Sequence, residues 1–295
     1  MNSDSGLGRQ LADLVTFILL PLLCVVLPYS AGQRLIRTVA ARGWLLRARA
    51  AQAMAAARIH LPVEDEQQWK THWRMVELSD ARDMWYSLLG RQGSLVRSVQ
   101  HRNVPSKEKA LVMIGFHWGN GLRALMSFQQ LGLKPRLVYR AVGRDILRAA
   151  PFNYLYLKLL VRCIRKVCAG KPIEVPGGRR AFEAALGEEG TPVIVLDAPA
   201  LHEAASIQSE VLGQVVLFNR NGARLLAEHE TRCSFFALGL DASEQMFLHC
   251  EDPFSPASAD DLMMEYGHYL TKLLRQDSSQ WRLWHVAEQL FRKAP

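Results

Sequence analysis

A single histidine, His117, stands where an apolar run of the chain gives way to a turn rich in glycine. Residues Ala110–Ile114 predict a buried strand, and the spacing of Leu122, Leu125 and Met126 predicts a helix directly after the turn. In α/β sheets, catalytic side chains usually lie between the end of a strand and the start of a helix. His117 is therefore a candidate general base. A structural histidine remains the alternative that this segment alone leaves open.

A general-base histidine needs an acceptor that holds its imidazole in one tautomer. The first candidate is Asp197, which carries a charge and follows the apolar run Val193–Leu196. Asn120 is the second candidate, through its amide oxygen, and it is also a candidate to contact the substrate. The structural alternatives are a helix N-cap or loop role for Asp197 and a turn role for Asn120 between two glycines. The third option is that His117 has no such partner.

Donors for a developing oxyanion can come from backbone N–H groups at the start of the helix at Gly121, or from an arginine. Arg140 ends an expected strand on the same face as His117, so it is a candidate to bind a phosphate or the oxyanion. The remaining histidines have no metal-ligand spacing, and no metal site is predicted. Solvated surface charges are the alternative for every arginine.

The second half of the chain alternates short apolar runs with helical patterns. Strands are predicted at Leu111–Gly115, Arg136–Arg140, Pro172–Val175, Pro192–Leu196, Glu210–Leu217, Cys233–Leu240 and Gln245–Cys250. Helices are predicted at Gly121–Leu131, Phe152–Cys168, Gly178–Gly187, Asn221–Glu230, Asp260–Arg275 and Ser279–Arg292. This alternation predicts an α/β fold with a mixed central sheet covered by helices.

The N-terminal part has a different pattern. Leu14–Pro28 is almost wholly apolar but shorter than the roughly 20 residues that span a bilayer. Five arginines follow it, and no acidic residue lies between Pro28 and Glu64. This order favours a helix that lies in, or dips into, the cytoplasmic leaflet, and a buried core helix is the alternative. We expect residues 1–60 to form this helical segment and residues 61–295 to form the α/β domain.

Composition narrows the range of partners. The 295 residues carry a net charge of +8, which attracts phosphates, anionic headgroups or acidic carrier proteins. No aromatic–basic motif supports nucleic-acid binding. The five cysteines are odd in number and lack CxxC spacing, which argues against a disulfide scaffold or zinc ribbon and suits a reducing compartment.

Taken in order, several segments resemble the lipid A biosynthesis acyltransferases, the lauroyl and myristoyl transferases of the wider lysophospholipid acyltransferase-like group. The matching segments are the apolar N-terminus with its basic helix, Gly115–Leu125, Val138–Arg140, the helix bearing Arg162 and Arg165, Ala181–Gly190, Val193–Asp197, Val216–Ala227 and Gln280–Trp284. The resemblance covers nearly the whole chain. It implies a glycerolipid acyltransferase-like fold at the cytoplasmic face of a bacterial inner membrane.

The resemblance also implies a chemistry. The family transfers a fatty acyl group from an acyl carrier protein or coenzyme A thioester to a lipid or glycolipid hydroxyl or amine, with no other cofactor. His117 matches the histidine of its His-x4-Asp/Glu pair, whereas Leu122 stands at the acid position and cannot accept a hydrogen bond. One arginine in the region of Arg162 and Arg165 would bind substrate.

Two other functions are alternatives to an active acyltransferase. A catalytically inactive relative would keep only the binding of acyl carrier protein or membrane lipid. An α/β hydrolase is disfavoured because the chain has no Gly-x-Ser-x-Gly elbow. A carboxylate within hydrogen-bond distance of His117 would distinguish the active enzyme from the inactive relative.

Overall fold

The computed structural model describes residues 6–104, 111–140, 143, 147, 150–187, 190–200 and 203–292. Its centre is a seven-stranded sheet in the order β1-β9-β8-β2-β5-β3-β4. The strands are β1 (Gln100–Arg102), β2 (Leu111–Gly115), β3 (Pro135–Arg140), β4 (Ile173–Val175), β5 (Thr191–Val195), β8 (Arg232–Leu240) and β9 (Met246–Cys250). Neighbours pair in parallel except β8 and β9, so the sheet is mixed, as predicted.

The middle strands are apolar and buried along nearly their whole length. All five residues of β2 are buried, as are the first four of β5 and eight of the nine in β8. A strand that is covered on both faces needs such an unbroken apolar run. This requirement explains why the sequence marked these strands clearly.

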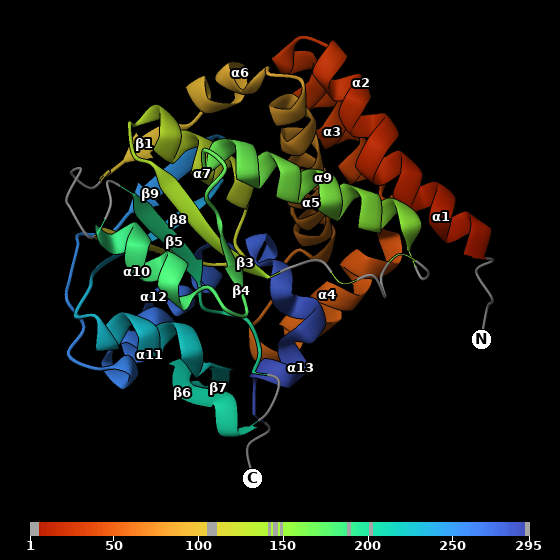
Figure 1. Cartoon of the computed structure of the whole chain (residues 1–295). Coiled ribbons are helices and arrows are strands. Elements are labelled where there is room, and N and C mark those ends of the chain that lie inside the picture. The colour runs from red at the N-terminus through yellow and green to blue at the C-terminus, as the bar shows by residue number, and fades with distance from the viewer. Residues whose placement is uncertain are drawn as a thin grey trace.

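Helices cover both faces of the sheet (Figure 1). Right-handed crossovers place α7 (Gly121–Gln130) and α9 (Pro151–Val167) on one face. The same rule places α10 (Arg179–Gly187) and α11 (Arg220–Glu228) on the other face, where α12 (Ala259–Asp277) packs against α11. The α/β class with a helix-covered mixed sheet is therefore confirmed.

The first part of the chain is helical and packs on the face that carries α7 and α9. Its elements are α1 (Gly6–Leu14), the π-helical turn η1 (Val15–Leu19), α2 (Leu20–Val26), α3 (Tyr29–Arg42), α4 (Arg47–His60), α5 (Glu66–Leu88) and α6 (Gln92–Arg97). Phe17, Cys24 and Ile36 belong to the same hydrophobic cluster as the sheet. In the ranges given above, no helix is both long and apolar enough to cross a membrane. The division between residues 60 and 61 stays a prediction.

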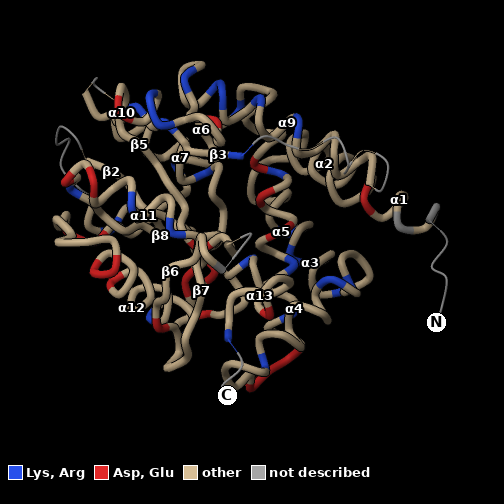
Figure 2. The backbone as a smooth tube through the Cα atoms, turned by 60° about the horizontal axis from the view of Figure 1, so that its bottom comes forward, with Lys and Arg blue, Asp and Glu red and all other residues tan. Residues whose placement is uncertain are grey.

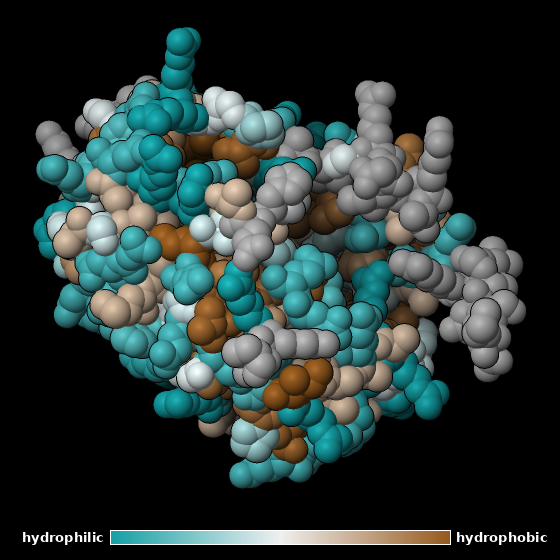
Figure 3. Space-filling view, turned by 90° about the horizontal axis from the view of Figure 1, so that it is seen from below, coloured by the Kyte–Doolittle hydropathy of each residue, from teal (hydrophilic) through white to brown (hydrophobic). Residues whose placement is uncertain are grey.

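Helix α5 is the central support of this face. It contacts α2, α3, α4, α7 and α9, and it carries both acidic and basic residues (Figure 2). Several of its charged side chains are fully buried, among them Arg82 and Asp83. The lower face of the molecule, in contrast, shows separate hydrophobic groups among hydrophilic residues (Figure 3).

Two predicted elements are wrong. The strand expected at Glu210–Leu217 is an antiparallel hairpin of β6 (Ser206–Val211) and β7 (Gln214–Asn219). Its two turn residues, Leu212 and Gly213, have φ values of 56° and 75°, which match the twist of a tight hairpin. Leucine is rare in that conformation, so Leu212 does not indicate a turn in the sequence.

The helix expected at Ser279–Arg292 is also broken. It consists of the 3-10 turns η3 (Ser278–Gln280) and η4 (Arg282–Val286) and the short α13 (Ala287–Leu290). Between the two 3-10 turns, Trp281 is extended, with φ −80° and ψ 123°. It forms a β-bridge with Trp118, which follows His117. This pairing outweighs the helical spacing of the segment.

Candidate active site

His117 lies in the loop between β2 and α7, at the carboxyl end of β2. The C-terminal segment holds this loop through backbone hydrogen bonds. The Arg282 N–H donates to the His117 carbonyl at 2.8 Å, and the Gly119 N–H donates to the Gln280 carbonyl at 3.0 Å. The backbone of His117 is thereby fixed, while 44% of its side chain is exposed to solvent.

Gly119 shows why this turn needs glycine. Its φ is 55°, and a Cβ atom there would lie 1.9 Å from the carbonyl oxygen of Leu238 on β8. Any larger residue would meet backbone rather than a flexible side chain. The close approach of the loop to β8 therefore sets the position of His117.

Asp197 supplies the carboxylate beside His117. It follows β5, which pairs in parallel with β2, so the carboxyl ends of both strands meet at one edge of the sheet. The His117 Nδ1–H donates to Asp197 Oδ1 at 2.6 Å, and the His117 backbone N–H donates to Oδ2 at 2.9 Å. Asp197 is fully buried. The structure thus brings together the two residues that the sequence ranked first.

Two further residues complete the support of this pair. The indole Nε1–H of Trp281 donates to Asp197 Oδ2 at 2.9 Å. The Tyr266 hydroxyl donates to the Gly115 carbonyl at 3.1 Å. Burial, and then the charge of Asp197, raises the pKa of the Tyr266 phenol well above its ordinary value, so the hydroxyl stays protonated.

The tautomer of His117 follows from these bonds. A carboxylate can only accept hydrogen bonds, so Nδ1 of His117, at 2.6 Å from Asp197 Oδ1, carries the ring proton. The lone pair is then on Nε2, the other ring nitrogen. A neutral imidazole held in this way can take a proton from a hydroxyl or amine.

Asn120 does not contact the imidazole. It is fully buried, and its Nδ2 donates to Asp83 Oδ2 at 3.1 Å. It is absent from the lining of the described cavities beside His117, so the structure gives no support to the expected substrate contact. Leu122, at the position where the family has its acid, is buried in α7.

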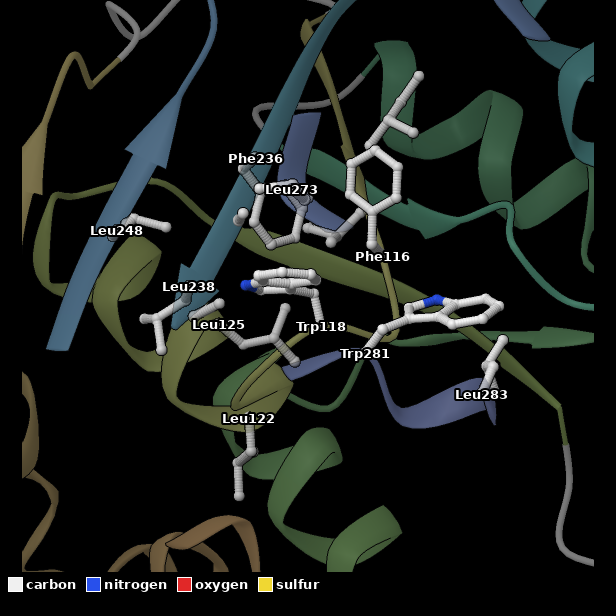
Figure 4. Packing of buried hydrophobic residues seen from close by; sticks show 14 of the residues in the cluster. Phe116, Trp118, Leu122, Leu125, Phe236, Leu238, Leu248, Leu273, Trp281 and Leu283 are labelled. Atoms are coloured by element: carbon white, nitrogen blue, oxygen red, sulfur yellow. The ribbon is translucent and has the colours of Figure 1, made fainter. Parts of the chain in front are cut away.

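A small apolar cavity of about 200 Å³ begins at His117. Its wall comes from the loop after β2, from α5, α7, α9 and η4, and from strands β3, β5 and β8, and includes Leu122, Leu125, Leu160 and Phe236. Figure 4 shows Leu122, Leu125 and Phe236 in the packing around Trp118. The cavity offers an apolar environment next to the imidazole.

A larger cavity of about 1070 Å³ also reaches His117. It lies between the ends of β3 and β4, the loop after β4, and helices α10 and α11. Arg140, Arg179 and Arg224 are in its lining, but Arg179 and Arg224 form ion pairs with Glu228. Leu137 and Val195 line both cavities, so the two meet beside the imidazole.

The three predicted arginines are therefore in different places. Arg140 is exposed at the end of β3 and lines the larger cavity. Arg162 and Arg165 are exposed on α9 and are absent from the lining of both cavities. Arg165 hydrogen-bonds the hydroxyl of Tyr139 and pairs with Glu174 at 3.7 Å. Only Arg140 stands where a substrate beside His117 could reach it.

Sequence reasoning missed a charged group at the wall of the small cavity. Arg282 donates to Glu77 at 2.7 Å and to Asp80 at 2.8 Å, and the Tyr156 hydroxyl donates to Asp80 at 2.9 Å. Burial raises the pKa of the Asp80 carboxyl, although Arg282 lowers it in part. The available signal was the helical spacing of Glu77, Asp80 and Asp83, a pattern that is more typical of a solvated face than of buried ion pairs.

No protein-family model matches the chain, and a search of curated proteins finds no significant relative. The site is therefore interpreted from its own geometry.

Proposed function

We propose that this protein is a membrane-associated acyltransferase. It transfers a fatty acyl group from the thioester of an acyl carrier protein or coenzyme A to the hydroxyl or amine of a lipid or glycolipid. The observation that carries the proposal is the His117–Asp197 pair at the junction of the two cavities. The small cavity suits an acyl chain, and the larger one suits an acceptor that presents its nucleophile to the imidazole.

In the proposed reaction, Nε2 of His117 takes the proton of the acceptor hydroxyl as the oxygen attacks the thioester carbonyl carbon. A tetrahedral oxyanion forms, the C–S bond then breaks, and the leaving thiolate receives the proton from Nε2. Asp197 stabilises the imidazolium that forms in between and keeps the ring oriented. Trp281 holds the carboxylate and does not itself contact the reacting atoms.

The start of α7 is the proposed source of oxyanion donors. Asn120 is its N-cap but makes no side-chain cap, and the first turn contains no acidic residue. Gly121 and Leu122, the first residues of the helix, line the small cavity beside His117. Their backbone N–H groups and the helix dipole favour negative charge at this point.

Membrane association is proposed from the surface of the N-terminal helices. Leu19, Leu23 and Val26 are 51%, 50% and 74% exposed, and their spacing places them on one side of the helix. Trp44, at 57% exposure, adds an aromatic side chain of the type that favours the membrane interface. Substituting serine for both Leu23 and Val26 should reduce co-sedimentation with vesicles, and unchanged sedimentation would contradict the proposal.

The inactive relative is the rival function, and the carboxylate on His117 favours the enzyme. The test is incubation of the full-length protein with acyl carrier protein thioesters and membrane lipids, with mass spectrometry of acylated lipid and of free fatty acid. His117→Ala should abolish acyl transfer, whereas His268→Ala, an exposed histidine on α12, should not. Full activity of His117→Ala would refute the mechanism. Release of free fatty acid alone would show a thioesterase instead.

A further inference from the structure

A second polar cluster, apart from the His117 cavities, lies between α5, α7 and α3. The guanidinium groups of Arg82 and Arg123 and the carboxylate of Asp83 are all fully buried there. Arg123 donates to Asp83 through Nε at 2.8 Å and Nη2 at 2.5 Å, and Arg82 through Nη2 at 3.2 Å. Two cations share one anion, so this group has an excess positive charge, for which burial demands compensation.

Tyr29 lies directly over this cluster. The guanidinium of Arg82 is 5.2 Å from the centre of the Tyr29 ring. Burial raises the pKa of the Tyr29 phenol, but the charges of Arg123 and Arg82 together lower it by more. The pKa is therefore below its ordinary value. The charges of the buried arginines therefore act on a side chain that also lines a neighbouring pocket.

A pocket of about 260 Å³ opens on the outer side of Tyr29, and we name it the Tyr29 pocket. Its lining includes Ser30, Gln33, Arg34 and Arg37 from α3. Gln33 accepts a hydrogen bond from Arg82 Nη1 at 2.6 Å through its Oε1, which leaves its NH2 group as a donor for a ligand. Every one of these polar groups can donate a hydrogen bond.

The first turn of α3 adds to the same effect. The helix begins at Tyr29, its N-cap Pro28 makes no side-chain cap, and the turn has no acidic residue. Uncapped N–H groups at a helix start attract anions. Glu244 is the acidic residue in the lining, and it forms an ion pair with Arg37, which leaves Arg34 as the cation at the rim.

We infer that the Tyr29 pocket binds a phosphate group, either of a soluble molecule or of a lipid headgroup. A tetrahedral phosphate can accept from the side chains of Ser30, Gln33 and Arg34 together, and its charge offsets the excess of the Arg82–Arg123–Asp83 group. A lipid headgroup is one source because Val26, which is exposed on the same side of the helix as Leu19 and Leu23, precedes Tyr29 by three residues. The Tyr29 pocket shares no lining residue with the cavities at His117.

The test is titration of the full-length protein with inorganic phosphate at constant ionic strength, followed by calorimetry. Arg34→Gln removes the rim cation, and Arg42→Gln removes an equally exposed arginine at the other end of α3. Losing a charge-assisted hydrogen bond should weaken phosphate binding about tenfold or more in Arg34→Gln, with Arg42→Gln like the wild type.

Vesicles distinguish the source of the phosphate. Both variants are sedimented with phosphatidylcholine vesicles that contain or lack phosphatidic acid. If Arg34→Gln alone loses the preference for phosphatidic acid, the ligand is a headgroup; if it loses only soluble phosphate binding, the ligand is a soluble phosphate. Equal behaviour of Arg34→Gln and Arg42→Gln in both assays would overturn the inference. Because phosphate binding in the Tyr29 pocket does not depend on acyl transfer, an inactive His117→Ala protein should retain it.

Discussion

Asp197→Asn is the sharpest perturbation of the proposed chemistry, because the two carboxylate oxygens have different partners. Oδ2 accepts from the His117 backbone N–H and from Trp281, whereas Oδ1 accepts from His117 Nδ1. An asparagine keeps the first two bonds if its amide oxygen takes the place of Oδ2. Its NH2 group then faces Nδ1, which must become an acceptor. The ring proton moves to Nε2, and the lone pair needed for the base is lost.

The size of the effect follows from two losses. A hydrogen bond to a charged group contributes about 1.5–3 kcal/mol, and each 1.36 kcal/mol is about a factor of ten in rate. Loss of imidazolium stabilisation alone therefore lowers kcat about tenfold to a hundredfold. With the wrong tautomer included, the total loss from the same substitution reaches about 10⁴-fold in enzymes with a comparable arrangement. We expect a fall of 10²–10⁴-fold.

Two measurements check this reasoning. Single-turnover transfer of acyl groups from carrier protein thioesters gives the rate of the chemical step. Nitrogen-15 NMR of labelled histidine gives the tautomer, with Nδ1–H in the wild type and Nε2–H in Asp197→Asn. Thermal unfolding should change little, because the buried shape is kept. A variant that retains the Nδ1–H tautomer, or the full rate, would refute the argument.

Three further predictions concern other parts of the molecule. Gly119→Ala should lower the free energy of unfolding by about 2–4 kcal/mol in urea denaturation, because its Cβ meets the Leu238 carbonyl and φ is positive; normal stability would show that the loop can shift. Hydrogen bonding to Asp277 raises the pKa of His72, so the pair stabilises the fold fully below pH 6.5 and progressively less as pH rises through the raised pKa; His72→Gln should remove this pH dependence of the urea midpoint. Leu125→Phe should narrow the small cavity and shift activity toward shorter acyl chains, by about fourfold in kcat/KM for each excluded methylene at ~0.8 kcal/mol; an unchanged chain-length profile would place the acyl chain elsewhere.

The sequence predicted the strands of the sheet well because their burial is encoded locally. β2, β5 and β8 are almost unbroken apolar runs, and the predicted bounds of these three strands match the observed ones within one residue at either end. The three-residue edge strand β1 was missed because all its residues are exposed, so no apolar pattern marks it. An apolar sequence pattern indicates burial, and an exposed edge strand has too few buried residues to produce such a pattern.

The sequence favoured Asp197 over Asn120 as the partner of His117, but it could not establish that the two side chains meet. It depends on β2 and β5 being neighbours, and that order is a property of the whole sheet rather than of either strand. Trp281 could not be assigned for a related reason. Its spacing to Trp284 fits one helical face, and only the bridge to Trp118 makes it extended and turns its indole toward the carboxylate.

Leu122, which stands at the acid position of the His-x4-Asp/Glu motif, lies in the wall of the small cavity. A carboxylate on α7 at that position would be buried in the apolar wall beside Leu125 and Phe236, where it would need its own compensation. Asp197 is buried as well, but its carboxylate has this compensation in the hydrogen bonds from the His117 backbone N–H and from Trp281. Leu122 is then free to add apolar surface where an acyl chain would lie. The departure from the family motif is therefore compatible with a working base, provided that the carboxylate of Asp197 stays in place.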